Sequence, residues 1–240
     1  MKRWHLVECA GEQLEVSADK ALYWPRRKSL FISDPHFGKA SSFHEMGIPV
    51  PIGNTEVDLE RLGKLVAETA AERLIILGDF FHHRSGQCDA TMGAIETWIA
   101  AHRGLEIILI KGNHDRRSDD PPETWGIEVH HRPLADPPFL YCHEPCKNEH
   151  LLVLCGHIHP AIALKDTFGP ALRLPCFIFS KSQALFPAFG SFTGSFALRP
   201  KTGDVVIGVH GGELFLVSDG KGEARKRRSR FGRKSGVDAG

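Results

Sequence analysis

Short, uninterrupted apolar runs separated by polar loops dominate the first half of the chain. Three such runs occupy residues 30–32, 74–77 and 107–110, and runs of this kind are typical of strands that are buried on both faces. Between them, apolar residues recur at helical spacing from Thr55 and again from Asp89. This alternation of strands and amphipathic helices predicts a parallel sheet that is covered on both faces.

After Asp120 the pattern changes, because helical periodicity is absent and Pro, Gly and Asp separate short apolar segments. Strands are predicted at 128–131, 139–142, 151–155, 172–179, 192–198, 204–209 and 214–217. A further pair of short strands is expected between Trp4 and Val16, joined by a Gly-containing turn. We therefore expect an α/β protein in which a second sheet packs on the first. No flexible linker divides the chain, so residues 1–220 are predicted to form one domain.

Two finer expectations concern individual side chains. Thr55 and Asp58 have the spacing of a capping box at the start of a helix. Four phenylalanines are expected in the core, because core positions are the commoner place for aromatic residues; they are Phe186, Phe189, Phe192 and Phe196.

The net charge of +1 conceals an uneven distribution. Residues 221–240 carry eight Lys or Arg and two acidic residues, and the remaining 22 basic and 27 acidic residues give 1–220 a net charge of −5. The segment 225–230 has no large apolar residue, so 221–240 is predicted to be a disordered basic tail. Such a tail is either a non-specific arm for nucleic-acid phosphates or a solvated segment without a partner, and the sequence favours neither.

Composition also bears on location. The longest apolar runs are a handful of residues, too short to span a membrane, and the N-terminus lacks the apolar stretch of a signal peptide. The six cysteines are scattered without paired spacing, and Cys142 and Cys146 alone leave a thiolate metal site weakly supported. We expect a cytoplasmic protein with reduced thiols.

Five polar fragments carry the chemistry. Each follows an apolar run or a turn, and in chain order they are Asp34-Pro35-His36, Gly78-Asp79, Gly112-Asn113-His114-Asp115, His143 and Gly156-His157-Ile158-His159. They supply carboxylate, amide and imidazole ligands, a set that favours Mn, Fe, Zn or Co over Ca or Mg. Because ligands bind beyond the carboxyl ends of parallel strands, the fragments are expected to converge at one edge of the sheet.

The residue types suggest separate tasks within a site for two divalent cations. Asp79 is a candidate bridging carboxylate, Asn113 adds a ligand without charge, and the remaining ligands would be Asp34, His36, His143, His157 and His159. His143 has competitors in His130, His131 and His150, but it alone follows an apolar strand directly. Water coordinated by such a pair of metals is acidified enough to attack a phosphate ester at neutral pH.

Other residues near the fragments are candidates for catalysis and substrate binding. His114 is expected to assist the leaving oxygen, with Asp115 holding its ring. Glycines 78, 112 and 156 would let the backbone approach the ligands closely. Contacts with substrate phosphate are predicted for His82, His83, Arg84, Lys39 and Arg116. The alternative for each of these is an ordinary solvated loop or helix position.

The ordered set Asp-x-His, Gly-Asp, Gly-Asn-His-Asp, His, Gly-His-x-His resembles the calcineurin-like metallophosphoesterases. Four further stretches resemble their ligase-associated DNA damage response endonuclease subfamily, namely residues 34–40, 47–51, 174–177 and 187–194. The resemblance implies a two-sheet β-sandwich flanked by helices and a dinuclear, manganese-dependent phosphodiesterase acting on DNA in bacterial repair. It also implies a link to a DNA ligase and a helicase.

The resemblance further implies a division of the ligands between two cations. One would take Asp34, His36, Asp79 and His159, and the other would take Asp79, Asn113, His143 and His157, with His114 as the catalytic histidine. Mn²⁺ is the first expectation, with Fe, Zn or Co as alternatives. The rival functions are the same chemistry on a cyclic nucleotide or phosphomonoester, and a repair scaffold that does not cut. The intact ligand set argues against the scaffold.

Overall fold

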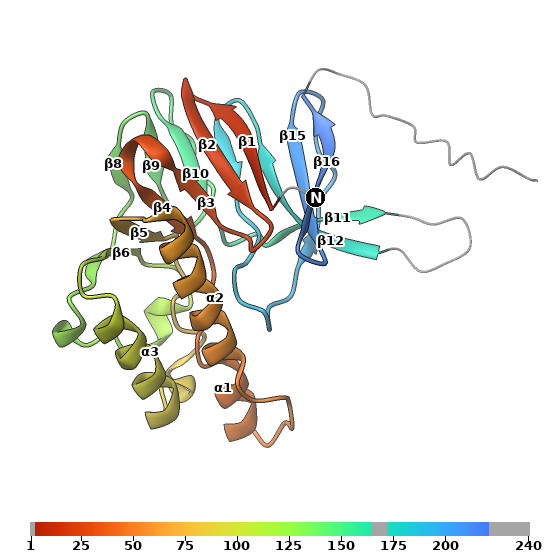
Figure 1. Cartoon of the computed structure of the whole chain (residues 1–240). Helices are drawn as coiled ribbons and strands as arrows, with labels where there is room; N and C mark the ends of the chain where they lie inside the picture. Colours follow the sequence, from red (N-terminus) through yellow and green to blue (C-terminus); the bar gives the residue numbers. More distant parts are fainter. Residues whose placement is uncertain (1–2, 165–171, 221–240) are drawn as a thin grey trace, which may run out of the picture.

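The computed structural model describes residues 3–164 and 172–220, and two β-sheets lie face to face within it (Figure 1). The first sheet runs in chain order, and its strands are β1 (Trp4–Cys9), β2 (Glu12–Ser17), β3 (Leu22–Trp24), β4 (Ser29–Ile32), β5 (Arg73–Ile76), β6 (Glu106–Ile110) and β7 (Glu128–His130). β1 to β4 pair antiparallel, whereas β4 to β7 are parallel. The parallel half contains the three apolar runs of the sequence. The predicted basic tail, 221–240, lies outside the described residues.

The second sheet is built from the short strands after residue 133. They are β8 (Leu134–Asp136), β9 (Phe139–Tyr141), β10 (Leu152–Cys155), β11 (Pro160–Leu164), β12 (Leu172–Phe179), β13 (Gln183–Leu185), β14 (Phe196–Ala197), β15 (Val205–His210) and β16 (Glu213–Asp219). Their order is β14-β11-β12-β13-β10-β9-β8, and the hairpin of β15 and β16 pairs with β12. β9, β10 and β13 are parallel to one another, so their carboxyl ends lie at one edge.

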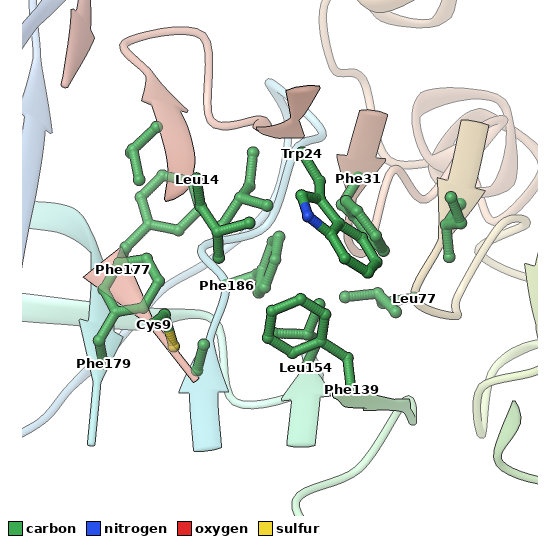
Figure 2. Close-up of a cluster of buried hydrophobic side chains, with 14 of the residues drawn as sticks. Cys9, Leu14, Trp24, Phe31, Leu77, Phe139, Leu154, Phe177, Phe179 and Phe186 are labelled. Atoms are coloured by element: carbon green, nitrogen blue, oxygen red, sulfur yellow. The ribbon is translucent and has the colours of Figure 1, made fainter. Parts of the chain in front are cut away.

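Large apolar side chains fill the space between the two sheets (Figure 2). Trp24 of the first sheet meets Phe139 of the second edge to face, with ring centroids 4.9 Å apart, and Phe31 meets Tyr141 in the same way at 5.1 Å. These rings are among the most fully buried side chains of the described chain. Burying each of them is worth on the order of 2–3 kcal/mol, so this layer is a main source of stability.

Helices cover the other face of the first sheet. They are α1 (Lys39–Glu45), α2 (Asn54–Thr69) and α3 (Asp89–Ala101). Leu59, Leu62 and Leu65 of α2 pack with Ile95 of α3 onto the apolar faces of β4, β5 and β6. The predicted fold class, a two-sheet α/β sandwich with flanking helices, is therefore confirmed. No helix in the described ranges combines the length and apolarity that a membrane crossing needs.

The capping box predicted at Thr55 and Asp58 is wrong. α2 begins after Gly53, whose φ is 87°, and no side chain caps it. Thr55 Oγ1 instead accepts a hydrogen bond from the backbone N–H of Gly38, and Asp58 binds Ser191. Both side chains thus tie the start of α2 to neighbouring loops rather than to their own helix.

The expectation for the four phenylalanines is half right. Phe186 and Phe189 are fully buried. Phe192 is only half-buried and meets Phe43 at 5.8 Å, whereas Phe196 is 63% exposed. The segment predicted as a strand over 192–198 has only Phe196 and Ala197 in a strand, because a turn occupies 191–192 and residues 193–195 have no regular structure.

Candidate metal centre

The polar fragments lie where the parallel strands of both sheets end. Asp34 and His36 follow β4, Asp79 follows β5, and Asn113 follows β6. The pairing of Ile32 with Ile76, and of Ile76 with Leu109, brings these three strand ends side by side. His143 follows β9 and His157 and His159 follow β10 in the second sheet, so that both sheets contribute to one cluster.

Three groups of ligand-type side chains form within this cluster, and two of them contain a carboxylate. Asp34, His36 and His159 make one group, and Asp79, His143 and His157 make the other, with ligand atoms in each group within 4.8 Å of one another. Asp79 faces both groups, because its Oδ2 lies 3.6 Å from His36 Nε2 and its Oδ1 lies 3.5 Å from His143 Nε2. A carboxylate in this position has the geometry that a bridging ligand needs.

Asn113 completes the second group. Its Oδ1 lies 2.9 Å from His143 Nε2 and 2.9 Å from His157 Nδ1. In the first group, Asp34 Oδ1 lies 3.2 Å from His159 Nε2. All seven residues predicted as metal ligands are thus brought together, including His143. Its competitors His130, His131 and His150 belong to neither group.

The backbone of these ligands is strained. Five of them have left-handed φ angles: 51° at Asp34, 48° at His36, 51° at Asp79, 64° at His157 and 48° at His159. Residues other than glycine rarely adopt this backbone conformation, and it costs on the order of 1–3 kcal/mol at each position. Such strain concentrates at functional sites, where the surrounding structure imposes it, so it points independently to this cluster.

Glycines allow three of the ligands to reach their positions. A Cβ at Gly78 would lie 2.1 Å from Nδ1 of His143, and φ at Gly78 is 83°. A Cβ at Gly112 would lie 2.1 Å from Oδ1 of Asp79. A Cβ at Gly156 would lie 2.3 Å from Oδ2 of Asp34. No other residue fits at any of these three places without displacing the neighbouring ligand.

The donor set fits divalent transition metals. His36 Nε2 is buried without a hydrogen-bond partner in the described chain, which is costly unless the nitrogen has another bond to make. Burial lowers the pKa of His36, so its imidazole is neutral, the form that binds a metal. Burial raises the pKa of Asp79, and a bound cation would favour its ionised form. Paired nitrogen and oxygen donors of this kind suit Mn, Fe, Zn or Co.

His114 lies beside these two groups and forms a third, all-histidine group with His36 and His82, whose ligand atoms also lie within 4.8 Å of one another. Its backbone N–H donates to Asp79 Oδ1 at 2.9 Å, and its ring Nδ1 lies 2.7 Å from the carbonyl oxygen of His82. Because a carbonyl only accepts, Nδ1 must carry the proton in this contact. Nε2 is then left for a substrate, either as an acceptor or, when the ring is protonated, as a donor.

The predicted contact between Asp115 and the His114 ring is wrong. The Asp115 carboxylate accepts instead from two backbone N–H groups, those of Phe81 at 3.1 Å and of Gly112 at 2.8 Å. Burial raises the pKa of Asp115 to about 6. Asp115 therefore braces the loops after β5 and β6 against each other, and the His82 carbonyl takes the orienting role.

The predicted substrate contacts have different surroundings. His82 is half-buried, its Nδ1 is 3.3 Å from His36 Nδ1, and burial lowers its pKa to about 4. His83 accepts from the backbone N–H of Ser85, and Arg84 forms an exposed ion pair of 3.1 Å with Asp119. These contacts give His83 and Arg84 local partners of their own. His82 is thus the member of this trio that adjoins the cluster.

The other two predicted contacts lie on different sides of the cluster. Lys39 begins α1 close to His36, and its ammonium group is 6.0 Å from the centre of the Phe192 ring. Arg116 is exposed and lies in the short 3₁₀ helix Asp115–Arg117, directly after His114.

Sequence reasoning missed one supporting contact. Asp58 and Arg61 of α2 form an ion pair of 2.8 Å, and both hold the loop after β13. Asp58 accepts from the N–H of Ser191 at 2.8 Å, and Arg61 donates to the carbonyl of Phe189. In the same loop the N–H of Phe189 donates to Ser33 O at 2.6 Å, next to Asp34. The signal was present as Asp58 and Arg61 one helical turn apart, but nothing local identifies their partners.

Known proteins share the sequence and the fold that carry this cluster. Residues 27–124, which include four of the seven ligands, match the sequence model described as calcineurin-like phosphoesterase. The crystal structure of Pseudomonas putida nuclease MPE is 41% identical, covers 85% of this chain and 96% of its own, and superposes with a TM-score of 0.75. The chain belongs to the calcineurin-like phosphoesterase family. It is accordingly a metal-dependent phosphoester hydrolase, as the sequence predicted, and the match is consistent with the predicted endonuclease subfamily.

More distant matches add little. A protein of unknown function from Aquifex aeolicus is 20% identical over 59% of this chain and 82% of its own, with a TM-score of 0.37. The phosphoesterase Yfce from E. coli is 16% identical over 79% of this chain and 92% of its own, with a TM-score of 0.36. No curated protein sequence matches the chain.

Proposed function

We propose that this protein is a dinuclear-metal phosphodiesterase that cuts DNA. One observation carries the proposal: two groups of buried and partly buried ligands share Asp79, whose two oxygens face one group each. Two cations about 3.5–4 Å apart are a standard arrangement for hydrolysis of phosphodiesters. The DNA substrate is supported by the 41% identity to a nuclease along 96% of that protein's chain.

The proposed roles follow the contacts. One cation would be held by Asp34, His36, Asp79 and His159, and the other by Asp79, Asn113, His143 and His157. When bound, the two cations would acidify water at the site and offset the charge of the phosphate. His114 Nε2, in its protonated state, donates a proton to the departing sugar oxygen while the His82 carbonyl fixes the ring. His82, Lys39 and Arg116 would contact substrate phosphates around this centre.

The cellular setting is part of the proposal. We propose Mn²⁺ as the metal, a cytoplasmic location, and a role in bacterial DNA repair that is functionally linked to a DNA ligase and a helicase. Residues 1–220 would form the catalytic domain and 221–240 a basic appendage. These assignments rest on the subfamily resemblance and on the composition of the chain.

A metal-screened assay tests the function. Supercoiled plasmid, single-stranded DNA and 2′,3′-cyclic nucleotide are offered side by side with Mn, Fe, Zn or Co. We expect Mn²⁺-dependent nicking that is abolished in Asp79→Asn. His114→Ala should lower kcat by about 10²- to 10⁴-fold, with a smaller loss on a p-nitrophenyl ester, whose leaving oxygen needs no proton.

The controls separate the rival functions. His150→Ala, which changes an exposed histidine outside both ligand groups, should leave nicking unchanged. Intact plasmid together with hydrolysis of the cyclic nucleotide would assign the site to small substrates. Lack of turnover of every substrate with every metal would favour the scaffold and overturn the proposal.

A further inference from the structure

A basic groove opens beside the second ligand group, on the side of His143. It has a volume of about 290 Å³ and is lined on one wall by Lys111, Arg116, His131 and Arg132. The other wall is formed by residues 142–146, which include His143 itself. The groove is therefore continuous with the proposed catalytic centre, and its size is on the order of the smallest ligand pockets.

The groove arises from the same topology as the centre. Arg116 follows β6, and His131 and Arg132 follow β7, which is parallel to β6 and ends at the same edge of the first sheet. The facing wall follows β9 of the second sheet. Basic side chains from the edge of the first sheet thus face the predicted metal ligand His143 from the second sheet.

The groove has more basic than acidic side chains, and some of the basic ones have no ion-pair partner in the described chain. Lys111 is ion-paired with Asp120, so its charge is largely offset. Arg116 and Arg132 are both exposed, and neither has an ion pair within residues 3–164 and 172–220. Glu144, on the opposite wall, is the acidic residue of the lining. Two uncommitted guanidinium groups next to a phosphate-cleaving centre are suited to binding further phosphates of the same substrate.

We propose that this groove binds the phosphate backbone of a DNA strand next to the scissile phosphate, with Arg132 as its outer contact. The proposal rests on the proposed function, because it supplies the strand that the centre would cut. It makes the enzyme sensitive to substrate length: a small diester occupies the centre alone, whereas an oligonucleotide also occupies the groove.

Substitutions of Arg132 test the groove. On a single-stranded oligonucleotide with Mn²⁺, Arg132→Ala should raise KM by roughly three- to tenfold. It should also reduce the slope of log KM against log salt by about 0.7, the value for one lost phosphate contact on a single strand. Arg132→Lys should recover most of the loss, because it keeps the charge. Hydrolysis of bis-p-nitrophenyl phosphate, which is too small to reach the groove, should keep its wild-type kcat and KM.

Two further variants test whether the change in KM depends on the charge of the groove. Glu144→Gln removes the acid of the groove and should lower KM for the oligonucleotide. Arg103→Ala is the matched control, because Arg103 is an exposed arginine in the connection that leads into β6, at the opposite end of that strand, and should change nothing.

The outcomes distinguish the two proposals. If the wild-type enzyme cuts the oligonucleotide but Arg132→Ala and Arg132→Glu keep its KM and salt dependence, the groove proposal is overturned and the nuclease function stands. If the wild-type enzyme hydrolyses bis-p-nitrophenyl phosphate but neither binds nor cuts oligonucleotides, the DNA function fails and the groove proposal fails with it. Direct binding of a fluorescent oligonucleotide to the metal-loaded protein separates these cases.

Discussion

Single residues in strained or crowded positions define the proposed centre. The ligands Asp34, His36, Asp79, His157 and His159 all have left-handed backbone angles, whereas only four other non-glycine residues in the described chain do. The left-handed angles are not a consequence of residue type, because Asp and His adopt other backbone conformations more easily. The structure thus holds ligands in place at an energetic cost, as expected for a site that is pre-formed before metal and substrate arrive.

The close approach at Gly112 gives a sharp test at this scale. In Gly112→Ala the new methyl group would lie 2.1 Å from Asp79 Oδ1 and 2.5 Å from Asp79 N, so the carboxylate must move. A displacement of about 1 Å at a catalytic group costs on the order of 100-fold in rate. We expect at least that loss of kcat on bis-p-nitrophenyl phosphate, together with a smaller rise of the melting temperature on adding Mn²⁺. Wild-type turnover in this variant would contradict the role of Asp79.

The matched control for this test is Gly104→Ala. A Cβ at Gly104 meets nothing within 4 Å, and its φ lies outside the left-handed region. Gly104→Ala should therefore keep both the activity and the response to Mn²⁺.

At the scale of elements, a buried carboxylate fastens the two sheets at one end. Asp136 of β8 accepts from Arg27 at 2.6 Å and from Arg73 of β5 at 2.9 Å, and Tyr141 of β9 donates to it at 3.0 Å. Burial alone would raise the pKa of Asp136, but the hydrogen bonds from Arg73 and Arg27 outweigh it and hold the pKa below its usual value. The ionised carboxylate therefore stabilises the fold.

This arrangement predicts a pH-dependent loss of stability in Asp136→Asn. At pH 7 we expect the free energy of unfolding to fall by about 1–2 kcal/mol, discounted because Arg27 is about half exposed. The depressed pKa means that the contribution is present above the unfolded-state pKa, near 4, and is lost as the pH falls through the folded value. Denaturant unfolding of the wild type and the variant at pH 7 and pH 3 measures the loss of stability and its pH dependence. Glu149→Gln, at an exposed position, is the control, and an equal effect at both pH values would contradict the ionic role.

The elements also show what a sequence can and cannot predict. β4, β5 and β6 are buried on both faces, so each reads as an unbroken apolar run, and the ligands that follow them could be placed at one edge from that fact alone. Three-residue strands such as β3 and β13 cannot be predicted from apolar and polar alternation, because they are too short to show it. The partners of Asp115 and Asp58 were unpredictable for another reason: both accept backbone N–H groups from segments distant in sequence, and a backbone group has no signature.

At the scale of the whole molecule, charge is separated between the body and the tail. Residues 1–220 carry a net charge of −5, although the groove beside the centre presents cations, whereas residues 221–240 carry a net charge of +6. A polyanion approaching an acidic body meets long-range repulsion, which a basic appendage would offset. The proposed DNA function therefore makes the nucleic-acid arm, rather than a solvated segment without a partner, the alternative to test.

Truncation after Gly220 tests that role. We expect the truncated protein to unfold at the same denaturant concentration and to hydrolyse bis-p-nitrophenyl phosphate as before, because the metal ligands all lie in 1–220. Its affinity for an oligonucleotide should fall at low salt, and the difference should shrink as salt rises, since up to eight Lys and Arg contacts with phosphate are lost. A full-length variant with those eight residues changed to Gln separates charge from length and should behave like the truncation. Unchanged affinity of both variants at low salt would leave the tail without a role in binding DNA.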